Sequence, residues 1–186
     1  NNSLIKYFVD KTDLDFQAIN NNITNPIQML VNHGYIDYVE TILNRNPKIV
    51  STKCRYNNNL LHYTLMPCYV YSNVPRIKSD KDIIELVKIF ANNKKINQNH
   101  RNNSGYRPIE VAIRYCSIDV IKELLKYNTT IFAENRIKQQ LFPVLNNNDI
   151  ISFATQLGRF DVVTYLIKEN VQFQFCLLYT SPSPRD

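Results

Sequence analysis

The chain has 186 residues, of which 44% are hydrophobic and 20% are charged. This balance is typical of globular proteins; no apolar run approaches the ~18 residues of a transmembrane helix, and no signal-peptide pattern opens the chain. The formal net charge of +6 comes from scattered lysines and arginines, which favours a solvated, mildly basic surface over a dedicated site for nucleic acid or another anionic surface.

Cysteines and histidines give no sign of catalytic or metal chemistry. The four cysteines form no C-x-x-C pair and have no histidine at zinc spacing, so free thiols in a reducing compartment are the simplest interpretation. His33, His62 and His100 fall in different helical patterns, and His62 is expected to be structural rather than a base. No phosphate-binding loop or metalloprotease motif is present. We therefore predict an intracellular protein that is not an enzyme and binds no cofactor or metal ion.

Helical patterns come in pairs that recur along the chain. The opening stretch "LIKYFVDKTDLDF" matches only the second member of a pair. The next pair has a short pattern opened by Pro26 and a longer one that follows Gly34. A looser pair combines "NLLHYTLM" with "DIIELVKIFANN", and two further pairs follow. Because internal periods of this size indicate a repeat protein, we predict five units, the first and last truncated: 1–19, 20–52, 53–100, 101–134 and 149–175.

The local physics of one pair explains its wording. Pro26 suits a first helical position, because its fixed φ and missing N–H are no handicap there. Gly34 should end that helix in the left-handed conformation that favours glycine, and Asp37 then falls at the positive dipole end of the next helix. Apolar residues at i, i+3 and i+4 give each second helix a stripe that only a neighbouring pair can cover. Equivalent signals stand at Pro108, Asp119, Gly158 and Asp161.

The spacing between units locates two insertions. The matching positions in the second helices are Leu4, Tyr38, Leu86, Val120 and Val162. The steps between them are 34, 48, 34 and 42 residues. Two of these steps are close to a period of ~33 residues. The longer steps place one insertion at 66–79, between the two helices of a unit, and a linker at 135–148. A binding loop and neutral drift are equally open for both.

This pattern resembles the ankyrin repeat. The segment "GYRPIEVAI", from Gly105 to Ile113, carries the Gly, Pro, apolar and Ala positions of that family. The segment "NNLLHYTL" keeps the family's histidine as His62, whereas "NPIQML" has Gln28 at that position. The resemblance covers roughly residues 3–175 and implies an all-α solenoid of stacked helix-turn-helix units joined by short hairpin or irregular loops. The bias toward residues with A/T-rich codons is similar to that of ankyrin proteins from large DNA viruses or A/T-rich protists.

The last eleven residues differ from everything before them. Residues 176–186, "CLLYTSPSPRD", resemble a translated sequencing adapter. We therefore expect a non-native tail and a natural sequence that is cut off near Phe175, within a larger protein.

The resemblance implies a binding function with another protein as partner. Ankyrin arrays use their inter-repeat tips and first-helix faces for contacts, and the insertions add loops. Aromatic and arginine side chains are the usual anchors of interfaces, so the candidates are Arg55, Tyr56, Arg101, Tyr106, Arg114 and Tyr115, with Tyr69 and Tyr71 in the first insertion. Two alternatives stay open: the targeting array of a ubiquitin-ligase adaptor or enzyme whose other domain is missing, and a binder of nucleic acid or anionic surfaces.

Overall fold

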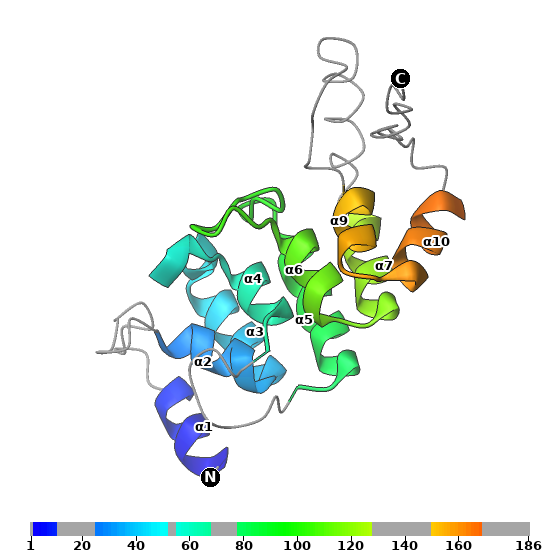
Figure 1. Cartoon of the computed structure of the whole chain (residues 1–186). Coiled ribbons are helices and arrows are strands. Elements are labelled where there is room, and N and C mark those ends of the chain that lie inside the picture. The colour runs from blue at the N-terminus through cyan, green and yellow to red at the C-terminus, as the bar shows by residue number, and fades with distance from the viewer. Residues whose placement is uncertain (1, 11–24, 52–54, 68–77, 128–149, 169–186) are drawn as a thin grey trace, which may run out of the picture. The chain divides into compact units, whose positions relative to one another are not determined.

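The computed structural model describes residues 2–10, 25–51, 55–67, 78–127 and 150–168. Within these ranges every regular element is a helix and no strand occurs (Figure 1). The chain divides into two compact units, residues 1–129 and 130–186. None of the described helices is long and apolar enough to cross a bilayer.

The first unit consists of stacked helices in two rows. One row is formed by short helices, α2 (Pro26–His33), α4 (Leu60–Leu65) and α6 (Pro108–Tyr115), each in contact with the next. The other row is formed by α1 (Asn2–Asp10), α3 (Ile36–Arg45), α5 (Asp80–Ala91) and α7 (Ile118–Tyr127). Each short helix also packs on the longer helix that follows it in the chain (Figure 1). This arrangement confirms the predicted all-α solenoid of helix-turn-helix units.

The predicted helix signals act where the sequence placed them. Pro26 occupies the first turn of α2, and Gly34 ends that helix with φ of 71°, its N–H bonded to the Val31 carbonyl. Asp37 lies in the first turn of α3. The pair α6–α7 has no glycine at its turn; there Cys116 ends α6 in an extended conformation with φ of −107°. Among the described residues, the turn between paired helices is thus made both with and without a glycine.

Apolar stripes of the longer helices form the core between the rows. Leu86 and Phe90 of α5 and Val120 and Leu124 of α7 are fully buried. Burial of each such side chain stabilises the fold by about 1.5–3 kcal/mol relative to exposure. No pair could bury these faces alone, which is why the helices stack.

Each short helix is capped by a pair of side chains, that of the N-cap residue before the helix and that of the third helical residue. In α2, Asn25 accepts a bond from the Gln28 N–H, and Gln28 accepts one from the Asn25 N–H, both at 3.0 Å. In α4, Asn59 accepts from the His62 N–H at 3.1 Å, and His62 Nδ1 accepts from the Asn59 N–H at 3.3 Å. Gln28 thus performs the local cap of the family's histidine.

The same two caps differ in what they reach beyond their own helix. His62 Nε2 lies 2.9 Å from the Tyr106 carbonyl oxygen, and Asn59 Nδ2 donates to the Asn97 carbonyl at 3.0 Å. Within the described part of the chain, the buried amide nitrogens of Asn25 and Gln28 have no hydrogen-bond partner. The junction between α4 and α6 is therefore bonded through its caps.

Lys78 joins the two ends of the first insertion. Its side chain is 5% exposed, and its Nζ donates to the carbonyls of Tyr63 and Thr64 at 3.0 and 2.8 Å. A lysine at this place satisfies carbonyls at the end of α4 that have no partner within the helix. Residues 68–77 of the insertion lie outside the described residues.

The second unit contains one described helix pair, α9 (Ile150–Gln156) and α10 (Phe160–Lys168), which pack on each other. Gly158 turns between them with φ of 68°. Asp161, in the first turn of α10, accepts two bonds from Arg159, and these bonds lower the pKa of its carboxyl. The predicted linker 135–148 and the adapter-like tail 176–186 lie outside the described residues.

Candidate partner-binding site

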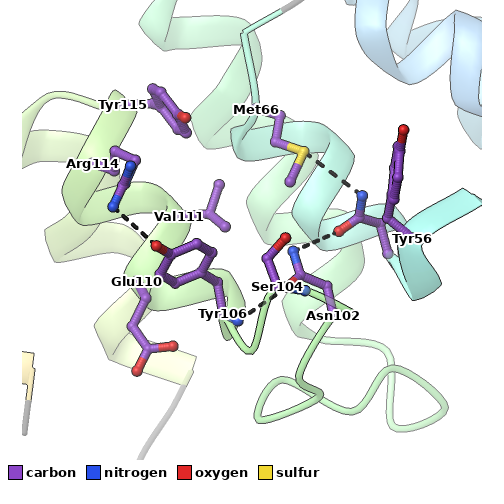
Figure 2. Close-up of a pocket in the computed structure, with 10 residues that line it drawn as sticks. Tyr56, Met66, Asn102, Ser104, Tyr106, Glu110, Val111, Arg114 and Tyr115 are labelled. Carbon is purple, nitrogen blue, oxygen red and sulfur yellow. Dashed lines mark hydrogen bonds between the residues drawn. The ribbon is translucent and has the colours of Figure 1, made fainter. Parts of the chain in front are cut away.

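Four of the predicted contact residues line one partly open pocket of about 260 Å³ in the first unit (Figure 2). Tyr56 comes from the tip before α4, Tyr106 from the turn before α6, and Arg114 and Tyr115 from the end of α6. The remaining lining residues are Asn58, Met66, Asn102, Ser104, Glu110 and Val111. We call this site the Tyr106 pocket.

Arg114 and Tyr106 form a fixed pair in the pocket. The guanidinium carbon of Arg114 lies 5.0 Å from the centroid of the Tyr106 ring, within cation–π range. Its Nη2 also donates to the Tyr106 hydroxyl at 3.1 Å. The Tyr106 N–H in turn donates to Asn102 Oδ1 at 2.9 Å, so the tyrosine is held at both ends (Figure 2).

Two buried asparagines form the bottom of the tips that border the pocket. Asn102 Nδ2 donates to Asn58 Oδ1 at 2.9 Å, which joins two successive repeats. Asn102 Oδ1 also accepts the Ser104 N–H at 3.0 Å, in addition to that of Tyr106. Because asparagine commonly closes such turns through its own side chain, these residues fix the backbone around the pocket.

The tip that carries Tyr56 has an unusual backbone. Tyr56 and Asn57 have positive φ values of 64° and 57°. Left-handed residues with a side chain are strained by of order 1 kcal/mol or more. The Tyr56 carbonyl accepts the Asn103 N–H at 2.8 Å, and His100 Nε2 bonds the Asn57 carbonyl at 2.8 Å. Contacts with the next tip therefore hold the strained backbone conformation at Tyr56 and Asn57.

Glu110 links the pocket to two arginines. Its carboxylate accepts bonds from the Arg107 N–H, Nε and Nη2 at 2.6 to 3.1 Å. Arg107 and Glu110 are 6% and 5% exposed, and Arg101 Nη1 lies 3.6 Å from the same carboxylate. In α6 an ion pair thus replaces the neutral cap pairs of α2 and α4.

The structure groups the predicted residues only in part. Arg101 does not line the pocket but contacts it through Glu110. Tyr69 and Tyr71 lie outside the described residues, as does the side chain of Arg55. Sequence reasoning missed the buried lining residues Asn58, Asn102 and Glu110. The turn propensity of Asn102 in "NNSG" was the one available signal for them.

A second pocket of about 270 Å³ lies at the turn between α2 and α3. It is lined by Gly34, Tyr35, Ile36, Asp37, Tyr38 and Glu85, none of which is a predicted contact residue.

Among the described residues, no three His, Cys, Asp or Glu side chains are grouped as a metal site would need. Burial lowers the pKa of His62 to about 4, which keeps this side chain neutral at pH 7.

The stacked helix pairs, with short capped first helices and longer second helices, define an all-α array of repeated helix-turn-helix units. The chain is 99% identical over 174 residues to an ankyrin repeat protein of Acanthamoeba polyphaga mimivirus, a match that covers 94% of this chain and 17% of that protein. It is 38% identical over 173 residues to a second ankyrin repeat protein of the same virus, covering 87% of this chain and 20% of the relative. No protein-family model matches the chain.

A relative from another virus shows the same likeness. An ankyrin repeat protein of Fowlpox virus is 28% identical over 177 residues, with 92% of this chain and 45% of that protein covered. The chain spans less than half the length of each of these three relatives. It is thus similar in sequence to ankyrin repeat proteins of large DNA viruses, as the resemblance predicted.

Proposed function

We propose that the chain is a non-enzymatic protein-interaction module and that the Tyr106 pocket is its contact site. The grouping of Tyr56, Tyr106, Arg114 and Tyr115 around one pocket carries this proposal. Tyr56 and Tyr115 are 44% and 45% exposed, so each offers a large aromatic surface for a partner to cover. Tyrosine and arginine are the side chains that contribute most often to binding hot spots. The names of the viral relatives support a repeat scaffold of this general kind.

The surrounding structure suits a pre-formed binding surface. Asn102 bonds both Asn58 and Tyr106, and the strained tip at Tyr56 is held by its neighbour. Side chains that are already ordered lose little conformational entropy when a partner binds. The described helix pairs fall inside the proposed repeats 20–52, 53–100, 101–134 and 149–175, whose boundaries we retain as proposals.

An affinity capture experiment tests the function. The whole chain, with a tag at either end, is used as bait in lysate of an amoebal host, and bound proteins are quantified by mass spectrometry. Arg114→Ala combined with Tyr115→Ala should lose the specific partners while circular dichroism shows an unchanged fold. A variant with Lys81→Ala and Lys94→Ala, which removes exposed charge elsewhere, should retain them.

Two outcomes would contradict the proposal. If the double variant at Arg114 and Tyr115 keeps every partner of the wild type, the pocket is not the contact site. If the wild type enriches no protein over the bait-free control, the chain is not an interaction module for this host. An adaptor role in a larger protein would show as a ligase component among partners that both variants retain.

A further inference from the structure

The described lining of the Tyr106 pocket carries no net charge. Glu110 and Arg114 are its two charged residues, one negative and one positive. The Glu110 carboxylate is bonded to the similarly buried Arg107, and Arg101 approaches the same carboxylate from outside the lining. Arg114 rests on the Tyr106 ring, with one nitrogen bonded to the tyrosine hydroxyl. A charged ligand would lose its hydration here and would have to compete with bonds that already exist.

The buried polar groups of the lining already have hydrogen-bond partners. The buried polar residues are Asn58, Asn102 and Glu110. Asn102 donates to Asn58 and accepts the N–H groups of Ser104 and Tyr106. Of the buried side-chain atoms that lack a partner in the described part of the chain, none belongs to this lining. A ligand can therefore cover these residues without supplying hydrogen bonds of its own, which favours an apolar group.

Apolar and aromatic side chains supply most of the remaining lining. Val111 is 2% exposed and forms part of the pocket wall, and Met66, Tyr56 and Tyr115 belong to the same lining (Figure 2). Aromatic rings attract other rings in edge-to-face contacts, and the sulfur of methionine makes favourable contacts with aromatic rings. The pocket, at about 260 Å³, is smaller than the sites of about 300–1,000 Å³ that enclose a whole small ligand, so it suits one large side chain.

We propose that the occupant of the Tyr106 pocket is an aromatic side chain, Phe or Trp, in an uncharged segment of a partner protein. Its ring covers Met66 and Val111 and contacts the exposed tyrosine rings of the lining. This inference rests on the proposed function and specifies the chemistry of its partner. A nucleic-acid base is also aromatic, but binding of the backbone requires several phosphate contacts, and Arg114 is the one basic residue of the described lining.

Selection from a random dodecapeptide display library on the immobilised whole chain tests this chemistry. Peptides selected by the wild type should be enriched in Phe or Trp, with no excess of Asp or Glu over the starting library. Met66→Ser and Tyr115→Ser should each reduce the aromatic enrichment, whereas Met66→Leu, which preserves the apolar surface, should keep it. Met29→Ser, at an exposed methionine of α2, is the matched control and should behave as the wild type.

The chain contains no tryptophan, so the fluorescence of a tryptophan in the peptide reports its contact directly. For a selected peptide with tryptophan at the aromatic position, the emission should shift to shorter wavelength on binding, and acrylamide should quench it less. Replacing this tryptophan with alanine should weaken binding about tenfold or more. Raising NaCl from 50 to 300 mM should change the affinity by less than about twofold, because no ion pair is formed.

Four results would overturn the inference. They are no selected peptides, peptides without aromatic enrichment, aromatic enrichment that persists in both serine variants of the pocket, and a peptide tryptophan whose emission does not change on binding. Peptides rich in Asp or Glu whose binding weakens steeply with NaCl would overturn it in favour of an acidic segment. Binding of a single-stranded oligonucleotide that requires Met66 and Tyr115 would overturn it in favour of nucleic acid.

The two proposals fail in distinguishable ways. Host proteins that are captured through Arg114 and Tyr115, together with peptides that show no aromatic preference, would refute the aromatic occupant and leave the interaction function intact. Capture that ignores these two residues would refute the contact site itself.

Discussion

His62 Nε2 lies 2.9 Å from the carbonyl oxygen of Tyr106, so the cap of one repeat is bonded to the turn that opens the next. The Tyr106 carbonyl can only accept, so Nε2 donates this bond and carries the single proton of the neutral ring, while Nδ1 faces the Asn59 N–H and Oδ1. The His62 side chain therefore caps α4, joins two repeats and fixes the backbone of Tyr106 at the pocket.

Acid should weaken the fold through His62. Burial lowers the pKa of this side chain to about 4, against 6.5 for a histidine side chain in water. Its contribution to stability is therefore complete above pH 6.5 and is lost as the pH falls from 6.5 to 4, by a total of about 3 kcal/mol. Urea unfolding of the wild type at a series of pH values in this window measures the loss.

The matched control for that prediction comes from the chain itself. Because Gln28 makes the same local cap in α2, His62→Gln should retain the cap but remove the titration. The difference in unfolding free energy between wild type and His62→Gln should shrink as the pH falls. A difference that stays constant from pH 7.5 to 4 would show that His62 does not titrate in this way.

Glu110→Gln should destabilise the first unit by about 3 kcal/mol, because it leaves the Arg107 guanidinium buried without its carboxylate. Combining Arg107→Asn with Glu110→His recreates the neutral pair of Asn59 and His62, and this double variant should lie within about 1 kcal/mol of the wild type. Chemical denaturation compares the three proteins. A double variant less stable than Glu110→Gln would contradict the equivalence of the caps.

Tyr56 should be held in a strained conformation that glycine relieves. Tyr56→Ala and Tyr56→Gly both remove the ring, but only glycine tolerates the φ of 64° without strain. Tyr56→Gly should therefore be about 1 kcal/mol more stable than Tyr56→Ala, measured by thermal and urea unfolding. Equal stabilities of the two variants would mean that the backbone of the tip relaxes. Both variants should also bind the partner more weakly than Tyr56→Phe, because they lack the ring.

Gly34→Ala should be more damaging than Gly105→Ala. Both glycines have positive φ, of 71° and 81°, so each substitution introduces strain of order 1 kcal/mol. A Cβ at Gly34 would also lie 3.1 Å from Lys78 Cγ, whereas one at Gly105 would meet nothing within 4 Å. Unfolding free energies of the two variants isolate this contact. Equal losses would show that the Lys78 side chain gives way freely.

Much of the fold could be predicted from local signals. Pro26, Gly34 and Asp37 act within one turn of a helix, and their effects depend on covalent geometry and dipoles that the sequence states directly. The stacking of the pairs followed from the apolar stripes, since no isolated pair could bury them. The turn at Cys116 lacked the glycine signal, but the spacing of its neighbours was enough to place it.

The candidate site was less accessible to sequence reasoning. Tyr56, Tyr106, Arg114 and Tyr115 could be chosen by residue type and repeat position, but their meeting at one pocket depends on how two successive tips dock. That docking is set by asparagine bonds across 44 residues, such as Asn102 to Asn58. In a chain rich in asparagine, nothing marks which of them are buried. The burial of the Arg107–Glu110 pair could not be predicted for a similar reason, because charged residues are normally expected at the protein surface.

The unequal caps give the first unit an order in which it opens. At the α4–α6 junction, His62 bonds to Tyr106 of the following repeat, and Asn59 bonds to the Asn97 carbonyl in the loop between α5 and α6. The buried amide nitrogens of Gln28 and Asn25, in contrast, have no partner among the described residues. In a repeat array, stability is a sum of unit and junction terms, so the weaker junction yields first. Amide hydrogens of α2 should therefore exchange before those of α4 and α6. The Tyr106 pocket, built on the stronger junction, would stay assembled while the N-terminal helices fray.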